Sequence, residues 1–186
     1  MRPQKGKQKL YDAAMRLFES QGYFATTVEQ ITVEAGVSKG LVYNYFESKE
    51  ALLAGLIAET TEKMESVAGS LSTGGSVEES LSGFIDQFLN YLKTEKHFLK
   101  LQLTLLMMPE LRAIVAEPQK ARADALLKMV INWFKQAGHT EPKNRARMFM
   151  AIMDGIALHY LSTYERYPLN AMKPQLMKAA RDLCSD

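Results

Sequence analysis

The chain has 186 residues, of which 47% are hydrophobic and 24% are charged, so it is long enough to bury a core and too apolar to be a disordered protein. Its formal net charge of +2 is too small to indicate a nucleic-acid partner by itself, so a DNA-binding surface has to be sought locally. The single cysteine, Cys184, excludes an internal disulfide and a cysteine-based metal site.

The N-terminal segment is cationic and contains Arg2, Lys5, Lys7 and Lys9 without an acidic residue. It is either an arm that lies near phosphates or an ordinary solvated terminus. The apolar core and small-residue cleavage site of a secretory signal do not follow it, and no apolar run reaches the roughly 18 residues of a membrane span. We therefore expect a cytoplasmic protein.

Helical periodicity runs through nearly the whole chain, and it predicts an all-α fold of about nine to ten helices. The first helix is expected over residues 5–21, ending before Gly22, which suits the left-handed position after a helix. The second helix is expected to begin at a capping box whose first residue is Thr26 or, one residue later, Thr27.

A tight turn follows the second helix. Gly36 is expected to end that helix early, and Ser38 is placed to cap a very short third helix that extends through Phe46. Two short helices joined by a tight glycine turn form a helix-turn-helix.

A helical wheel of residues 39–46 separates an apolar side from a small polar side. The apolar side holds Leu41, Val42, Tyr45 and Phe46, and the polar side holds Lys39, Gly40, Tyr43 and Asn44. A lysine and an asparagine suit base edges in the major groove or a phosphate, a tyrosine suits a phosphate, and Gly40 lets the backbone come close. Taken singly, each of these side chains is equally an ordinary exposed residue.

Three segments resemble the N-terminal signature of the TetR family of regulators in order and spacing: TVEQI at 27–31, AGVSKG at 35–40 and YNYFESKEAL at 43–52. The resemblance covers about residues 7–55. It implies an N-terminal three-helix DNA-binding domain over residues 1–48 and a C-terminal helical ligand-binding and dimerisation domain over residues 49–186.

The resemblance also assigns roles by position. Phosphates would be held by Thr27, Ser38, Tyr43, Tyr45 and Lys49, and bases would be approached by Lys39, Gly40 and Asn44. Two positions depart from the family pattern, because Leu41 stands where a threonine that contacts DNA is common and Tyr45 stands where histidine is common. Leu41 either touches a thymine methyl group or fills the core.

The C-terminal part contains an apolar helix over residues 148–161 that has to be covered on nearly all sides. It is either the central helix of a monomer or a helix at a twofold interface, and the resemblance implies the second, a four-helix bundle made by the last two helices of each subunit. Upstream, Pro109 and Pro118 are placed to open helices and Gly138 is placed to close one.

An effector pocket is expected where methionine and aromatic side chains converge, because thioethers give an adaptable wall for apolar molecules. The candidates are Met107, Met108, Trp133, Phe134, Met150, Met153 and Asp154. The apolar ones are alternatively plain core. Asp154 would meet a polar or cationic group of the ligand, or would serve close helix packing at the dimer seam.

No enzyme is expected, because His97, His139 and His159 are far apart and no glycine-rich phosphate loop follows a strand. Neither a metal nor a cofactor is predicted. The sequence predicts a repressor that binds palindromic operator DNA as a homodimer and is released by a small, largely apolar effector. The alternative is a TetR-like DNA-binding protein without a small-molecule effector, either an activator or a module controlled by a protein partner.

Overall fold

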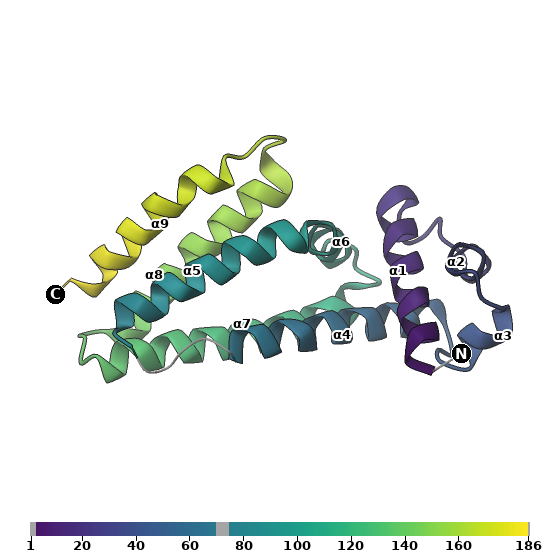
Figure 1. Ribbon diagram of the computed structural model, residues 1–186, viewed down its shortest axis with the longest axis horizontal. Helices are drawn as coiled ribbons and strands as arrows, with labels where there is room; N and C mark the ends of the chain where they lie inside the picture. The colour runs from purple at the N-terminus through teal and green to yellow at the C-terminus, as the bar shows by residue number, and fades with distance from the viewer. Residues whose placement is uncertain (1–2, 70–74, 186) are drawn as a thin grey trace. The chain divides into compact units, whose positions relative to one another are not determined.

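The computed structural model describes residues 3–69 and 75–185, and the regular structure within these residues is helical, as predicted (Figure 1). The elements are α1 (Pro3–Gln21), α2 (Val28–Ala35), α3 (Lys39–Tyr43), α4 (Lys49–Gly69), α5 (Val77–Thr94), α6 (Lys96–Leu106), α7 (Arg112–Gln136), α8 (Pro142–Leu158), the π-helix η1 (His159–Thr163) and α9 (Leu169–Cys184).

The chain divides into two compact units. One comprises Met1–Glu62 and Leu101–Pro118, and the other comprises Lys63–Lys100 and Gln119–Asp186. Within the described residues, no helix combines the length and the apolar character that crossing a bilayer requires.

The start of α2 is set by the second of the two predicted capping boxes. The amide of Gln30 donates to Thr27 Oγ1 over 3.2 Å, and the amide of Thr27 donates to Gln30 Oε1 over 2.8 Å. Thr26 is buried instead, and its hydroxyl donates to the carbonyl of Gly22 over 2.8 Å. At the other end, Gly36 adopts φ 62°, the left-handed conformation that a glycine tolerates at a helix C-terminus.

The third helix is shorter than predicted and its cap differs. It ends at Tyr43 rather than Phe46, because the amides of Tyr45 and Phe46 both turn back onto the carbonyl of Val42. Ser38 occupies the N-cap position with extended backbone, but its side chain makes no capping hydrogen bond. Ser38 is exposed, so water can satisfy the first amides of α3. Ser48 does cap α4, since its Oγ accepts from the amide of Ala51 over 3.0 Å.

The core of the first unit is formed where α1 packs against α2 and α3, together with the buried residues that begin α4. Its fully buried side chains include Leu10, Tyr11, Ile31, Leu52, Leu53 and Ile57. Leu41 is half-buried, and a Cβ on Gly6 of α1 would lie 3.3 Å from its Cδ2. Leu41 therefore packs on the protein, which favours the core interpretation of this residue.

In the second unit, α5 packs along α9, and α8 packs against α9 (Figure 1). The interior is aromatic: the Phe84 ring lies 5.5 Å from the Phe149 ring and 6.3 Å from the Trp133 ring, both edge-on. Arg145 of α8 holds the end of α9, because its Nη1 donates to the carbonyl oxygens of Leu183 (2.5 Å) and Ser185 (2.8 Å).

Proline positions were only partly predicted. Pro109 precedes α7, which begins at Arg112, but Pro118 lies inside α7 and does not open a new helix. Pro118 has no amide hydrogen and so removes a single backbone hydrogen bond, and α7, which has 25 residues in all, continues past it to Gln136. Gly138 adopts φ 78° just beyond the end of α7, where the sequence predicts a stop.

Candidate functional site

The short helix α3 presents a polar outer side to solvent. Lys39, Gly40, Tyr43 and Asn44 are exposed, and Tyr43 retains 51% of its accessible surface. On the opposite side, Val42 is buried, and α3 packs against α1 and α2. These two helices therefore hold α3 by its apolar side and leave its small hydrogen-bonding surface exposed.

An ion pair joins the first residue of α3 to α2. The Lys39 ammonium donates to Glu29 Oε1, and both side chains are more than half exposed. The hydrogen bond from Lys39 is the main cause of a lowered pKa at Glu29, and the same bond is the main cause of a raised pKa at Lys39. The opposite charges across the turn were the only sequence signal for this contact, and it was not predicted.

Lys49, at the start of α4, is engaged with the protein. Its Nζ donates to the carbonyl oxygens of Tyr23 (2.9 Å) and Thr26 (2.8 Å), and it lies 4.3 Å from the centroid of the Tyr23 ring. The Tyr23 hydroxyl in turn donates to Glu50 Oε1 over 3.0 Å. Burial, and then the bond to Glu50, raises the pKa of Tyr23. Lys49 thus fastens the turn between α1 and α2 to α4, and one ammonium proton remains for another acceptor.

The remaining candidates surround α3 at different depths. Thr27 is exposed, but its hydroxyl oxygen accepts the capping bond of α2. Ser38 is exposed beside Lys39. Tyr45 is half-buried, and its hydroxyl lies beside Gly6 of α1. All eight candidate DNA-binding residues belong to the first unit, so a single compact body carries them.

The seven effector candidates are divided between the two units and differ in burial. Met107 (76% exposed) and Met108 lie in the first unit, and the other five lie in the second. Trp133, Phe134 and Met153 are at most 5% exposed and are packed core residues, Met150 is half-buried, and Asp154 is exposed on α8. Loss of hydration beside neighbouring side chains raises the pKa of Asp154, and the charge of Arg122 opposes this shift.

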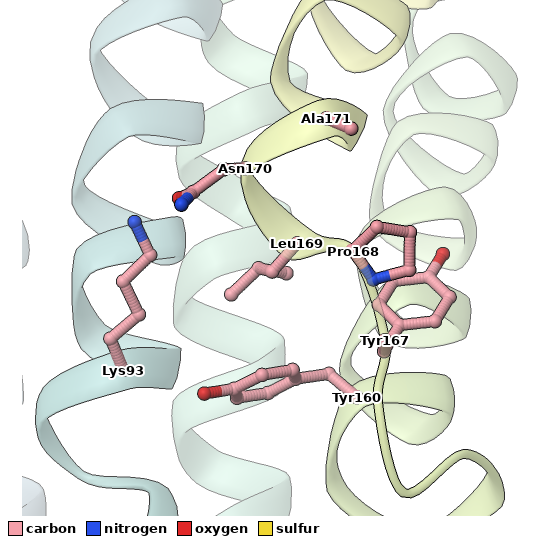
Figure 2. A pocket seen from close by; sticks show the side chains of 7 residues that line it. All are labelled: Lys93, Tyr160, Tyr167, Pro168, Leu169, Asn170 and Ala171. Atoms are coloured by element: carbon pink, nitrogen blue, oxygen red, sulfur yellow. The ribbon is translucent and has the colours of Figure 1, made fainter.

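A surface pocket of about 380 Å³ lies elsewhere in the second unit, where the end of α5, the π-helix η1 and the first turn of α9 meet (Figure 2). None of the seven effector candidates lines it. No group of histidine, cysteine and carboxylate side chains in the described part of the chain is arranged to hold a metal ion.

Comparison with known proteins gives matches to two family models. The model described as bacterial regulatory proteins of the tetR family matches residues 10–56, and the model described as a tetracyclin repressor-like C-terminal domain matches residues 76–184. The regulator YerO of Bacillus subtilis, named as an uncharacterized HTH-type transcriptional regulator, is 34% identical over 108 residues. That match covers 56% of this chain and only 37% of the relative's length.

Solved structures share the fold over nearly the whole chain. A transcriptional regulator from Aquifex aeolicus VF5 superposes with a TM-score of 0.78 at 26% identity, covering 96% of this chain and 99% of that one. The transcriptional regulator FadR from Bacillus subtilis, solved in complex with stearoyl-CoA, has a TM-score of 0.72 at 22% identity, and the match covers 93% of this chain and 96% of that one.

Proposed function

The chain belongs to the TetR family of bacterial transcriptional regulators, and on that premise we propose that it is a repressor that binds palindromic operator DNA as a homodimer and leaves it when a small, largely apolar effector binds. We assign DNA binding to residues 1–48 and effector binding and dimerisation to residues 49–186. As a member of this family the chain is a regulator of transcription and not an enzyme. The observation that carries the proposal is the exposed polar side of α3 on a buried apolar anchor.

DNA binding by this unit follows from the chemistry of its outer surface. The amide of Asn44 matches the paired donor and acceptor of an adenine edge, and the ammonium of Lys39 matches guanine acceptors or a phosphate. The space beside Gly40 is open, because a Cβ placed on this residue would meet no side chain or neighbouring segment within 4 Å, so a base edge can approach the backbone there. Tyr43, Ser38, Thr27, Tyr45 and Lys49 complete the set as proposed phosphate contacts that fix the register.

Dimerisation is proposed through α8, because part of its surface is apolar and uncovered in the single chain. Met148 (57% exposed) and Leu158 (51% exposed) lie on this helix with the exposed Ala151 between them. A second copy related by a twofold axis would remove these side chains from water. Such a dimer would present two copies of α3 to half-sites about one DNA turn apart.

Effector control is proposed by analogy with the fold of FadR, whose solved complex contains stearoyl-CoA. In this chain the proposed effector residues Trp133, Phe134 and Met153 already pack in the interior, so an effector has to open the second unit in order to reach them. Such a ligand shifts the DNA-bound population only if it binds the opened state more tightly than the closed one.

The same packing favours a second candidate function, a TetR-like DNA-binding protein without a small-molecule effector, either an activator or a module that answers to a protein partner. A packed interior offers no ready-made site for a small apolar molecule. Stearoyl-CoA is the first probe to separate the two. Release of bound DNA at micromolar probe supports the effector, whereas unchanged DNA affinity together with an unchanged melting temperature supports the second candidate.

The DNA-binding proposal is tested with duplexes selected from random sequence by the purified chain. Tyr43→Ala is expected to weaken binding to all selected duplexes, and Asn44→Ala is expected to relax the preference at one base position. Lys135→Gln, an exposed change in the second unit, serves as the matched control and should leave binding unchanged. Wild-type affinity and wild-type sequence preference in both Tyr43→Ala and Asn44→Ala would exclude α3 as the helix that recognises the DNA sequence.

The dimer is tested separately by sedimentation at several protein concentrations. Leu158→Glu places a charge on the exposed apolar side of α8 and is expected to yield monomers. Ala125→Glu, on the exposed surface of α7, is the control and should leave the oligomeric state unchanged. A wild-type chain that sediments as a monomer at all concentrations would contradict this part of the proposal.

A further inference from the structure

The surface pocket at the end of α5 has a composition that indicates a ligand. Its walls come from Lys93 of α5 and from two neighbouring segments much later in the sequence, Tyr160 of η1 and residues 167–171, which lead into α9. Its volume of about 380 Å³ is near the lower end of the range for small-molecule sites, about 300–1,000 Å³. The pocket is open to solvent, so a ligand can enter without a change in the fold (Figure 2).

The polar groups of the pocket include a cation but no acid. Figure 2 shows the Lys93 ammonium pointing towards the carboxamide of Asn170, and the Leu169 side chain lying between Asn170 and the Tyr160 ring. Within residues 3–69 and 75–185, no carboxylate pairs with Lys93 and no hydrogen bond engages the Asn170 side chain. A positive charge and an amide donor thus converge on one side of a cavity whose lining contains no negative charge.

The aromatic walls are held in place by neighbours outside the pocket. The Lys96 ammonium lies 4.4 Å from the centroid of the Tyr160 ring. The Tyr167 ring stacks on His159 at 5.9 Å and on Tyr164 at 6.0 Å, with interplanar angles of 18° and 20°. Because these contacts already fix the rings, a ligand does not have to order them on binding, and less conformational entropy is lost.

We propose that this pocket binds a small monocarboxylate with an aromatic body. The carboxylate would accept hydrogen bonds from Lys93 and Asn170, and the ring would lie against Tyr160 and Leu169. A single ammonium matches a single negative charge, which disfavours phosphate esters and nucleotides, whose multiple charges need more cations. The proposal rests on the second unit alone and does not depend on the proposed DNA binding or on the proposed interior effector site.

The test is isothermal titration calorimetry of the purified full chain with phenylacetate, using phenylacetamide as the uncharged probe of nearly the same shape. Phenylacetate is expected to bind with one site per chain, and the amide is expected to bind about tenfold more weakly because its neutral group loses the charge-assisted bond. Equal binding of the two probes, or no heat from phenylacetate up to millimolar concentration, would overturn the proposal.

Variants place the binding at this pocket. Lys93→Gln is expected to reduce phenylacetate affinity about tenfold, whereas Lys128→Gln, an exposed lysine on α7 that does not line the pocket, should leave it unchanged. Tyr160→Phe keeps the ring and should retain most of the affinity, and Tyr160→Ala should lose it. Circular dichroism melting of each variant verifies folding. Wild-type affinity in folded Lys93→Gln would assign the heat to another site and overturn the proposal.

Discussion

Replacing Lys49 by methionine separates two roles that this lysine can have, a phosphate contact and a clamp within the DNA-binding unit. Methionine keeps the apolar stem and removes the ammonium, so the carbonyl oxygens of Tyr23 and Thr26 lose their donor. A hydrogen bond to a charged group contributes about 1.5–3 kcal/mol, and the half-buried setting of Lys49 reduces the sum of two. We expect the free energy of unfolding to fall by about 2–4 kcal/mol, a large share of the roughly 5–15 kcal/mol of a typical domain.

The assay combines urea unfolding, followed by circular dichroism, with DNA affinity measured over a series of salt concentrations. If Lys49 acts mainly as the clamp, Lys49→Met lowers the unfolding midpoint, and the slope of log affinity against log salt stays at its wild-type value. A lost phosphate contact would instead reduce the magnitude of that slope by about 0.9. Lys39→Met is the matched control, because Lys39 is exposed and pairs with the exposed Glu29. It should change DNA binding while leaving the unfolding midpoint unchanged.

The result that would refute the clamp is a Lys49→Met chain with the wild-type unfolding midpoint and a reduced salt slope. That outcome would mean that the two bonds to carbonyl oxygens add little to stability, and that the ammonium acts as the phosphate contact proposed above.

Three further substitutions test contacts inside each of the two units. Arg145→Met should lower the free energy of unfolding by about 1.5–3 kcal/mol, because the last turn of α9 loses its donor; urea unfolding measures it, and wild-type stability would contradict the role. Gly55→Ala should lower the free energy of unfolding by about 1–3 kcal/mol, because the added Cβ would collide with the hydroxyl of Tyr11. An unchanged melting temperature would show that the Tyr11 ring moves aside. The raised pKa of Asp154 means that the folded state prefers the protonated carboxyl, so stability falls as the pH rises above the ordinary value of 3.8. Asp154→Asn should therefore raise the unfolding midpoint at pH 7 and weaken its pH dependence, and a lower midpoint would contradict this sign.

Features set by a few neighbouring residues were predictable from the sequence. The capping box at Thr27 needs a partner only three residues away, and Gly36 needs only its own backbone freedom. The polar side of α3 followed from the helical period alone. The choice between the boxes at Thr26 and Thr27 was not predictable, because it depends on the burial of Thr26 in the folded unit.

Features that depend on distant residues were not predictable in the same way. The acceptors of Lys49 lie 26 and 23 residues earlier in the chain, and no local pattern connects them. The spacing of methionine and aromatic residues suggested an effector pocket, but the same spacing is equally typical of a packed core. In the structure, Trp133 and Met153 are buried core residues. The surface pocket brings Lys93 next to residues that follow more than sixty positions later, so it becomes visible only once α5 and α9 are packed together.

The carboxylate of Glu29 has a consequence for how the regulator would search a chromosome. Before any DNA arrives, Lys39 already has an anionic neighbour, so an arbitrary phosphate gains less from this lysine than from an unpaired one. If Lys39 contacts DNA as proposed, random sequence would be bound less tightly and the chain would dissociate from it sooner. Only a sequence that presents a better-placed acceptor, such as a guanine edge, draws the lysine away from its resting partner. Glu29 would then contribute to the discrimination between DNA sites, because it competes with each DNA acceptor for the Lys39 ammonium and most sequences offer a weaker acceptor.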